Sequence, residues 1–127
     1  MEKRKKVEEA AMKEVIRYYQ RELKYDVDRV DSLNMGWDLE ASLGKHVLYI
    51  EVKGLSSKQI AVELTPNEYK SMIKNKLQYR VAVVTEALSR PKLSVFSHYP
   101  ESGKWEDDNG VIASVEEVKT ISARLTV

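Results

Sequence analysis

The chain has 127 residues, of which 43% are hydrophobic and 32% charged, so we expect one globular domain over residues 1–127. Lys and Arg number 21 and Asp and Glu number 20, and the net charge of +1 gives no overall attraction to nucleic acid or to an anionic membrane. The absence of cysteine excludes disulfides, thiolate metal sites and thiol nucleophiles. The sequence has neither an apolar stretch long enough to cross a membrane nor the apolar core of a signal peptide. We therefore expect a cytoplasmic protein with no membrane partner.

Periodic apolar residues predict helices and strands in the order α-β-β-β-β-α-β-β. The expected elements are a helix over residues 7–23, strands over 25–30, 36–43, 46–53 and 59–64, a helix over 66–76, and strands over 79–85 and 92–97. The tail is expected to hold a loop over 100–110, a turn of helix over 115–118 and a last strand from Thr120. This order indicates an α/β fold in which a mixed central sheet is flanked by helices.

Two segments carry the clearest local signals. Residues 47–50 are continuously apolar, as in a central strand covered on both faces, and Gly44 precedes them in a short connection typical of a hairpin. Thr65, Pro66 and Glu68 have the spacing of a helix start, because Thr65 can cap the helix and Glu68 can close a capping box. A capping box explains Thr65 and Glu68 without any ligand.

The pattern Glu-x-Lys occurs four times, at residues 22–24, 51–53, 68–70 and 117–119. The first and third pairs fall in predicted helices, where a spacing of two residues points side chains to different faces. The last pair lies in the weakly patterned tail. Glu51 and Lys53 alone follow a buried apolar strand, and residues two apart on a strand share a face. Context therefore selects Glu51 and Lys53 as the candidate site.

The other arm of the predicted hairpin adds a third ionisable residue, Asp38. Charges buried at a strand end are costly without a partner or a ligand. Asp38 and Glu51 offer carboxylate ligands suited to Mg²⁺ or Mn²⁺, and the carbonyl of Val52 could add another ligand. Such a metal polarises a phosphate and activates water, while Lys53 orients that water or stabilises the transition state. The three ionisable residues predict metal-dependent hydrolysis of phosphodiester bonds.

Four motifs, in this order, resemble a known family. They are VEEAAM at residues 7–12, GWDL at 36–39, YIEVKG at 49–54 and LTPNE at 64–68. Together they resemble the NO VEIN C-terminal-type domain, a member of the PD-(D/E)XK nuclease superfamily, over residues 7–84. The resemblance implies a restriction-endonuclease-like three-layer core with the mixed sheet between helices. Trp37 stands where the superfamily name has a proline.

The resemblance also implies residue roles and partners. Asp38 and Glu51 would bind the metal, Lys53 would be the catalytic lysine, and Glu8 would be an acid supplied by the first helix. The implied activity is that of a DNA endonuclease that works with a helicase or ATPase, or within a restriction or DNA-repair system. Nucleases that cut both strands commonly pair their active sites, so a homodimer is also compatible with the sequence.

Contacts to nucleic acid are expected near the second helix. Thr65 and Asn67 lie at its N-terminus, where backbone N–H groups favour phosphate, and Lys58 and Lys70 could follow the phosphate backbone. The alternative for the two lysines is a solvated surface. The basic run at residues 3–6 is interpreted as a solvated chain end.

Three alternatives to an active nuclease stay open. Glu51 and Lys53 can form a structural ion pair at a strand end. A nuclease-like fold can be kept as a catalytically inactive module that binds DNA or a helicase partner, since a fold does not by itself establish activity. The chain can also be a fragment of a larger helicase or restriction protein, because it contains no phosphate-binding loop of a motor.

Overall fold

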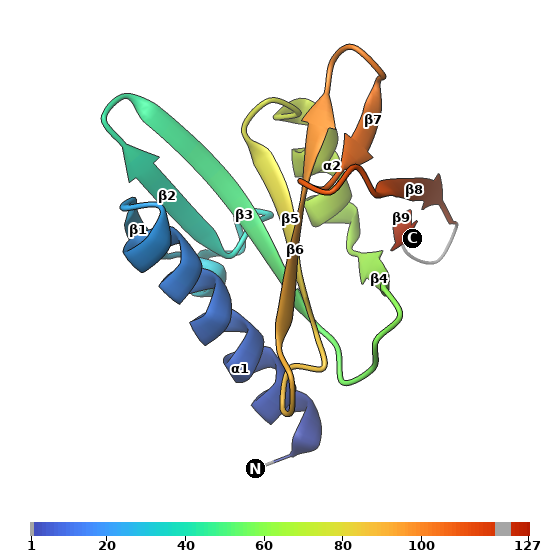
Figure 1. Cartoon of the computed structure of the whole chain (residues 1–127). Coiled ribbons are helices and arrows are strands. Elements are labelled where there is room, and N and C mark those ends of the chain that lie inside the picture. Colours follow the sequence, from blue (N-terminus) through green and yellow to red (C-terminus); the bar gives the residue numbers. More distant parts are fainter. Residues whose placement is uncertain (1, 119–122) are drawn as a thin grey trace.

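The computed structural model describes residues 2–118 and 123–127 (Figure 1). Its helical elements are α1 (Lys3–Arg17), the π-helical turn η1 (Tyr18–Glu22), the 3-10 turn η2 (Asp31–Leu33) and α2 (Pro66–Lys74). Its strands are β1 (Asp26–Arg29), β2 (Leu39–Leu43), β3 (His46–Gly54), β4 (Ala61–Leu64), β5 (Tyr79–Thr85), β6 (Lys92–Tyr99), β7 (Lys104–Glu106), β8 (Ile112–Glu117) and β9 (Ala123–Thr126). No helix in the described part of the chain is long and apolar enough to cross a membrane.

The strands of the described residues form one curled, mixed sheet in the order β1-β2-β3-β5-β6-β7-β8-β9-β4. β1, β2 and β3 make an antiparallel meander, and Gly44, with φ of 61°, lies in the short turn between β2 and β3. β5 lies parallel to β3, and parallel neighbours need a crossover connection, which here contains β4 and α2. The predicted mixed α/β fold is therefore confirmed.

Two apolar clusters cover the two faces of the central strands. Because side chains alternate along a strand, Ala82 and Val84 of β5 face one cluster, and Val81 and Val83 face the other. The first cluster lies under α1, which buries one stripe of apolar residues. The second cluster contains Met72 of α2. The two helices thus pack on opposite faces of the sheet (Figure 1).

Two glycines let the helices approach the strands near the predicted site. A Cβ atom on Gly54, at the end of β3, would lie 2.8 Å from Cβ of Ala11 and 2.9 Å from the carbonyl oxygen of Val7, both in α1. Gly36 has a φ of 98°, and a Cβ atom there would overlap the hydroxyl of Ser71 in α2. The absence of side chains at these two positions allows α1 and α2 to pack against the segments that flank the site.

The first helix begins earlier than expected. α1 starts at Lys3, so the basic run at residues 3–6 forms its first turn, whereas the apolar pattern places the start near Val7. At its other end the chain continues through the π-helical turn η1 to Glu22. Residues 3–6 are exposed, as expected of a solvated chain end, but they have helical structure.

The tail differs most from the expectation. The predicted loop over 100–110 contains β7, and the predicted turn of helix over 115–118 coincides with β8, which pairs with β7 and β9. Only one side chain of β8 is buried. Its sequence therefore carries little of the alternating apolar pattern that identifies a strand, and the expectation of a helix is wrong. The last strand is β9, and the predicted start at Thr120 lies outside the described residues.

β4 follows β3 in the sequence but lies at the far edge of the sheet. It pairs antiparallel with β9, and the backbone N–H of Val127 also donates to the carbonyl of Ile60 at 3.2 Å. The segment that joins β3 to α2 is therefore held by the C-terminal strand. This pairing fixes the chain immediately before Thr65, where α2 begins.

Candidate active site

Glu51 and Lys53 leave β3 on the face opposite to α1. Ile50 belongs to the cluster under α1 and Val52 packs against that cluster, so the residues between and after them project to the other face. There the ammonium of Lys53 lies 3.3 Å from Oε2 of Glu51 and 2.8 Å from Oε1 of Glu68 in α2. The strand geometry therefore brings Glu51 and Lys53 together.

The Glu51 carboxyl is almost fully buried, with 3% of the residue exposed. Burial, together with the charge of Asp38, raises the pKa of Glu51 to about 9, although the charge of Lys53 opposes the shift. Burial therefore favours the protonated form of this carboxyl, whereas the ammonium of Lys53 favours the ionised form. A buried carboxylate needs a cation or strong hydrogen bonds, so a metal ion would stabilise its ionised form.

Lys53 is held by a residue that the sequence pattern assigns only to the helix start. Burial lowers the pKa of Lys53, but the carboxylates of Glu51 and Glu68 outweigh burial and raise that pKa. Glu68 also accepts a hydrogen bond from the backbone N–H of Thr65 at 3.0 Å, and Oγ1 of Thr65 accepts one from the backbone N–H of Glu68 at 3.2 Å. The predicted capping box is confirmed, and its Glu68 also fixes the ammonium of Lys53.

Asp38, the residue before β2, is fixed by backbone hydrogen bonds. Its N–H donates to the carbonyl of Ile50 at 2.9 Å, its carbonyl accepts from the N–H of Val30 at 2.8 Å, and its Oδ2 accepts from the N–H of Val52 at 2.9 Å. Burial raises the pKa of Asp38, although the Val52 hydrogen bond opposes the shift. The β2–β3 pairing therefore aims the Asp38 carboxyl at the end of β3.

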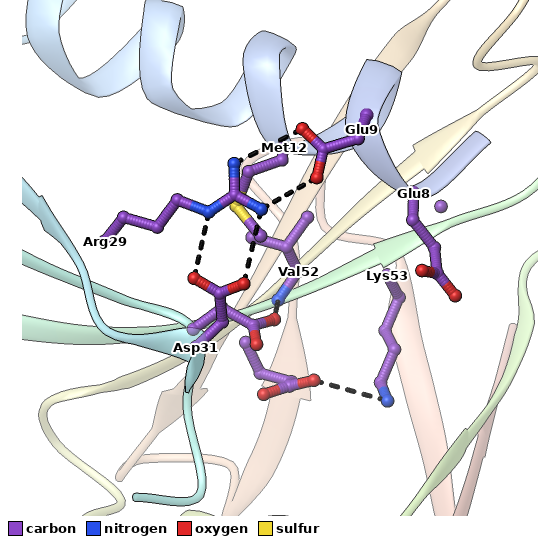
Figure 2. Close-up of a pocket in the computed structure, with 10 residues that line it drawn as sticks. Glu8, Glu9, Met12, Arg29, Asp31, Val52 and Lys53 are labelled. Carbon is purple, nitrogen blue, oxygen red and sulfur yellow. Dashed lines mark hydrogen bonds and ion pairs between the residues drawn. The ribbon is translucent and has the colours of Figure 1, made fainter. Parts of the chain in front are cut away.

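Asp38, Glu51, Val52 and Lys53 line one pocket of about 340 Å³, together with Glu8 of α1. Figure 2 shows the side chain of Glu8 descending from α1 on the same side of the pocket as Lys53. Glu8 is exposed, and its Oε1 lies 3.4 Å from Nε of Arg4. All four residues predicted for catalysis thus border the same space.

The opposite wall of the pocket holds an arginine that sequence reasoning missed. Arg29 of β1 donates to Glu9 of α1 at 2.7 Å and to Asp31 at 2.9 Å, and Figure 2 shows its guanidinium between the two carboxylates. Hydrogen bonds to Glu9 and then Asp31 raise the pKa of Arg29. Glu9 and Arg29 are twenty residues apart, so no local pattern could indicate this cluster.

The residues predicted to contact nucleic acid near α2 are not among those that line the pocket. Asn67 donates from Nδ2 to the carbonyl of Asn34 at 3.0 Å, so it ties α2 to the segment before β2. Thr65 caps the helix. Lys58 and Lys70 are exposed. The capping role of Thr65 and the loop contact of Asn67 account for both positions, and the predicted contacts of all four residues with nucleic acid stay predictions.

The pocket can supply oxygen ligands to a divalent ion. Asp38 and Glu51 provide two carboxylates, and no group of three or more His, Cys, Asp and Glu side chains arranged to hold a metal occurs in the described residues. Two carboxylates suffice for Mg²⁺, which usually keeps several water ligands. Asp38 and Glu51 therefore fit an ion that shares its coordination with water, and the ligand role of the Val52 carbonyl stays a prediction.

Comparison with known protein families shows the family to which the chain belongs. The family model described as Protein NO VEIN, C-terminal, matches residues 7–96, which is more than half of the chain. The protein therefore belongs to the NO VEIN C-terminal family. The matched stretch includes all residues that line the pocket and ends within β6. Neither a curated protein nor a solved structure matches the chain.

Proposed function

We propose that this domain is a metal-dependent DNA endonuclease of the PD-(D/E)XK superfamily, hydrolysing phosphodiester bonds at the pocket of Asp38, Glu51 and Lys53. The observation that carries the proposal is the convergence of these three residues, with Glu51 almost fully buried, on one pocket. The proposal includes Mg²⁺ or Mn²⁺ as cofactor, a helicase or ATPase as partner and a cytoplasmic location. It also allows a homodimer that cuts both strands.

The topology supports the superfamily assignment. The resemblance of the motifs implies a restriction-endonuclease-like core with three layers, and here α1 and α2 pack on opposite faces of the sheet. The antiparallel β1-β2-β3 meander is followed by a crossover through α2 to the parallel strand β5. In this arrangement Asp38 immediately precedes β2 and the Glu-x-Lys pair comes from β3, so one hairpin carries all three residues.

The charge of the pocket supports a cation cofactor. Five carboxyl groups line it, against the two cationic groups of Arg29 and Lys53. The carboxyl residues are Glu8, Glu9, Asp31, Asp38 and Glu51. A phosphodiester carries a negative charge, so it would be repelled by this excess unless divalent cations compensated it. When bound, a divalent ion supplies positive charge at the scissile phosphate and activates water.

The chain's own residues would perform the remaining tasks. Asp38 and Glu51, with the Val52 carbonyl, would hold the ion, and Glu8 would adjust the site from α1. The ammonium of Lys53 would donate a hydrogen bond to the attacking water or to a phosphate oxygen as charge develops there. Glu68 keeps this ammonium charged and in place, because it lies 2.8 Å from Nζ and stays available when Glu51 carries a proton.

The test is a nicking assay on supercoiled DNA with Mg²⁺, with Mn²⁺ and with chelator. Glu51→Ala and Lys53→Ala should each reduce nicking by about 100-fold or more, because each removes a group that acts on the transition state. Lys24→Ala is the matched control, since Lys24 is the exposed lysine of another Glu-x-Lys pair.

Equal nicking in the parent, Glu51→Ala and Lys53→Ala would remove this site from consideration. DNA affinity that survives Asp38→Ala, together with the absence of metal binding in calorimetry, would instead identify a catalytically inactive binding module.

A further inference from the structure

The basic run at residues 3–6 lies beside the candidate active site. These residues form the first turn of α1, and Figure 1 shows this end of α1 close to the point where β3 runs into the connection to β4. Gly54 permits this proximity, because a side chain there would collide with α1. The charge of this turn is therefore held at a defined place on the molecule.

Two members of the run line a second pocket. Lys3, Arg4, Val7 and Glu8 of α1 form one wall, residues 54–56 form the other, and the volume is about 390 Å³. Glu8 and Gly54 also line the candidate active site, so the two pockets adjoin each other at these residues. The combined groove is acidic at the candidate site and has two exposed cations at its other end.

This change of charge along the groove matches the requirements of a DNA strand. At the acidic end a phosphate needs divalent cations, but the phosphates on either side of the scissile one must be held by the protein. Lysine and arginine side chains are the usual contacts to phosphates, and they position a strand without reading its sequence. Lys3 and Arg4 are the cationic side chains that line the second pocket.

We propose that the groove between the first turn of α1 and residues 54–56 binds the DNA backbone next to the scissile phosphate, through Lys3 and Arg4. This inference rests on the proposed function, because it takes the neighbouring pocket as the place of cleavage. It names duplex DNA as the ligand and the sugar-phosphate backbone as the part recognised.

The dimensions of the helix give the position of this contact on the strand. Arg4 and Lys3 precede Glu8 by four and five residues, which corresponds to about 6–8 Å along the axis of α1. Each strand of B-DNA carries one phosphate per roughly 3.4 Å along its axis. A strand that runs along α1 would therefore meet the two cations about two nucleotides from a phosphate beside Glu8.

The existing partner of Arg4 does not block this contact. Arg4 pairs with Glu8 at 3.4 Å, and both side chains are largely exposed, at 84% and 60%. Exposed pairs of this kind contribute little to stability, so a phosphate can replace Glu8 as the partner of Arg4 at small cost.

The same turn of α1 supplies a matched control. With 3.6 residues per turn, residues 3, 4, 7 and 8 share one face of α1, while Lys5 and Lys6 point away from it. Lys5 and Lys6 are exposed and do not line the groove. The double variants Lys3→Gln/Arg4→Gln and Lys5→Gln/Lys6→Gln therefore remove equal charge from one helical turn. They differ only in whether the altered side chains face the groove.

The experiment measures the affinity of the full chain for a short fluorescent DNA duplex by anisotropy in Ca²⁺, across a range of salt concentrations. We expect Lys3→Gln/Arg4→Gln to weaken binding about tenfold and to reduce the salt slope by about 2, because two phosphate contacts are lost. Lys5→Gln/Lys6→Gln should change the affinity by less than about twofold. Circular dichroism of both double variants checks that α1 is intact.

Equal losses in the two double variants would overturn the proposal, since they would show a diffuse attraction of α1 rather than a groove. No loss in either, or no binding of duplex DNA by the parent, would overturn it as well. These results are separate from the cleavage test: if Lys53→Ala nicks DNA as the parent does, the proposed function fails, while the difference between the double variants still reports on the groove.

Discussion

Two Glu-x-Lys pairs of the same spacing lie in opposite surroundings. Glu51 and Lys53 share a buried face of β3, with 3.3 Å between carboxylate and ammonium. Glu22 ends the π-helical turn, its side chain is 52% exposed, and its carboxylate pairs with Arg17 at 2.9 Å. Lys24 follows in the left-handed region, with φ of 63°. A spacing of two residues therefore brings the two charges together only where the chain is extended and water is excluded.

The largest difference expected between the two pairs is in metal binding. Glu51→Gln and Asp38→Asn each remove a proposed ligand, so the affinity for Mn²⁺ should fall by at least about 100-fold. Glu22→Gln should leave this affinity unchanged, because Glu22 lies outside the pocket. Isothermal titration calorimetry measures all three variants. Parent-like affinity in Glu51→Gln would mean that the buried pair is as inert toward metals as the exposed one.

A second difference concerns the positioning of the lysine. Glu68→Gln removes the carboxylate 2.8 Å from Lys53, so cleavage should fall about tenfold to 100-fold through misplacement of the ammonium. Thr65→Ala is the control, because it breaks the same capping box at a cost of about 1 kcal/mol but keeps the contact between Glu68 and Lys53.

Kinetics and urea unfolding of both capping-box variants separate the two effects. Similar destabilisation with cleavage reduced only in Glu68→Gln supports a positioning role. Equal cleavage in the two variants contradicts that role and leaves Glu68 as a helix cap alone.

The smallest expected effect is on stability, and it depends on pH. Folding raises the pKa of Glu51 from 4.5 to about 9, so the folded protein binds a proton more tightly than the unfolded chain. In chelator, the contribution of Glu51 to the stability of the parent should therefore be greatest below pH 4.5 and should be lost as the pH rises toward 9. Glu51→Gln has no such proton and should be more stable than the parent by about 1–2 kcal/mol at neutral pH.

Urea unfolding at several pH values checks this expectation, with Glu22→Gln as the exposed counterpart. The advantage of Glu51→Gln over the parent should grow with pH and vanish in acid. An advantage that is the same at every pH would assign it to packing rather than to the buried carboxyl. Glu22→Gln should lose a little stability at neutral pH, because it weakens the pair with Arg17.

The sequence predicts the parts of the fold that depend on local patterns. The continuous apolar run at residues 47–50 identifies β3, Gly44 identifies the β2–β3 turn, and Thr65 with Glu68 identifies the start of α2. The short strands β7 and β8 carry few buried side chains, so their sequences resemble a loop. Their pairing is established by neighbouring strands, which no local window contains.

The candidate site also has one part that local patterns predict and another part that depends on contacts between residues distant in the sequence. Glu51 and Lys53 share a face because of strand periodicity, which is local and can be predicted. The contacts between Lys53 and Glu68 and between Arg29 and Glu9 join residues 15 and 20 positions apart, and they depend on how the helices pack on the sheet. The sequence of the basic run at residues 3–6 does not distinguish its four members, and only the packing of α1 against the end of β3 places Lys3 and Arg4 in one pocket with Gly54.

The pairing of β4 with β9 makes the site depend on residues beyond the stretch that defines the family. The match to the family ends at residue 96, whereas β9 spans Ala123–Thr126 and is the hydrogen-bonded neighbour of β4. A chain shortened to residue 96 would expose the edge of β4 just before Thr65, and would release one end of the helix that carries Glu68. The segment needed to transfer this site to another protein is therefore longer than the stretch that the family model matches. Such a graft must include the C-terminal strands.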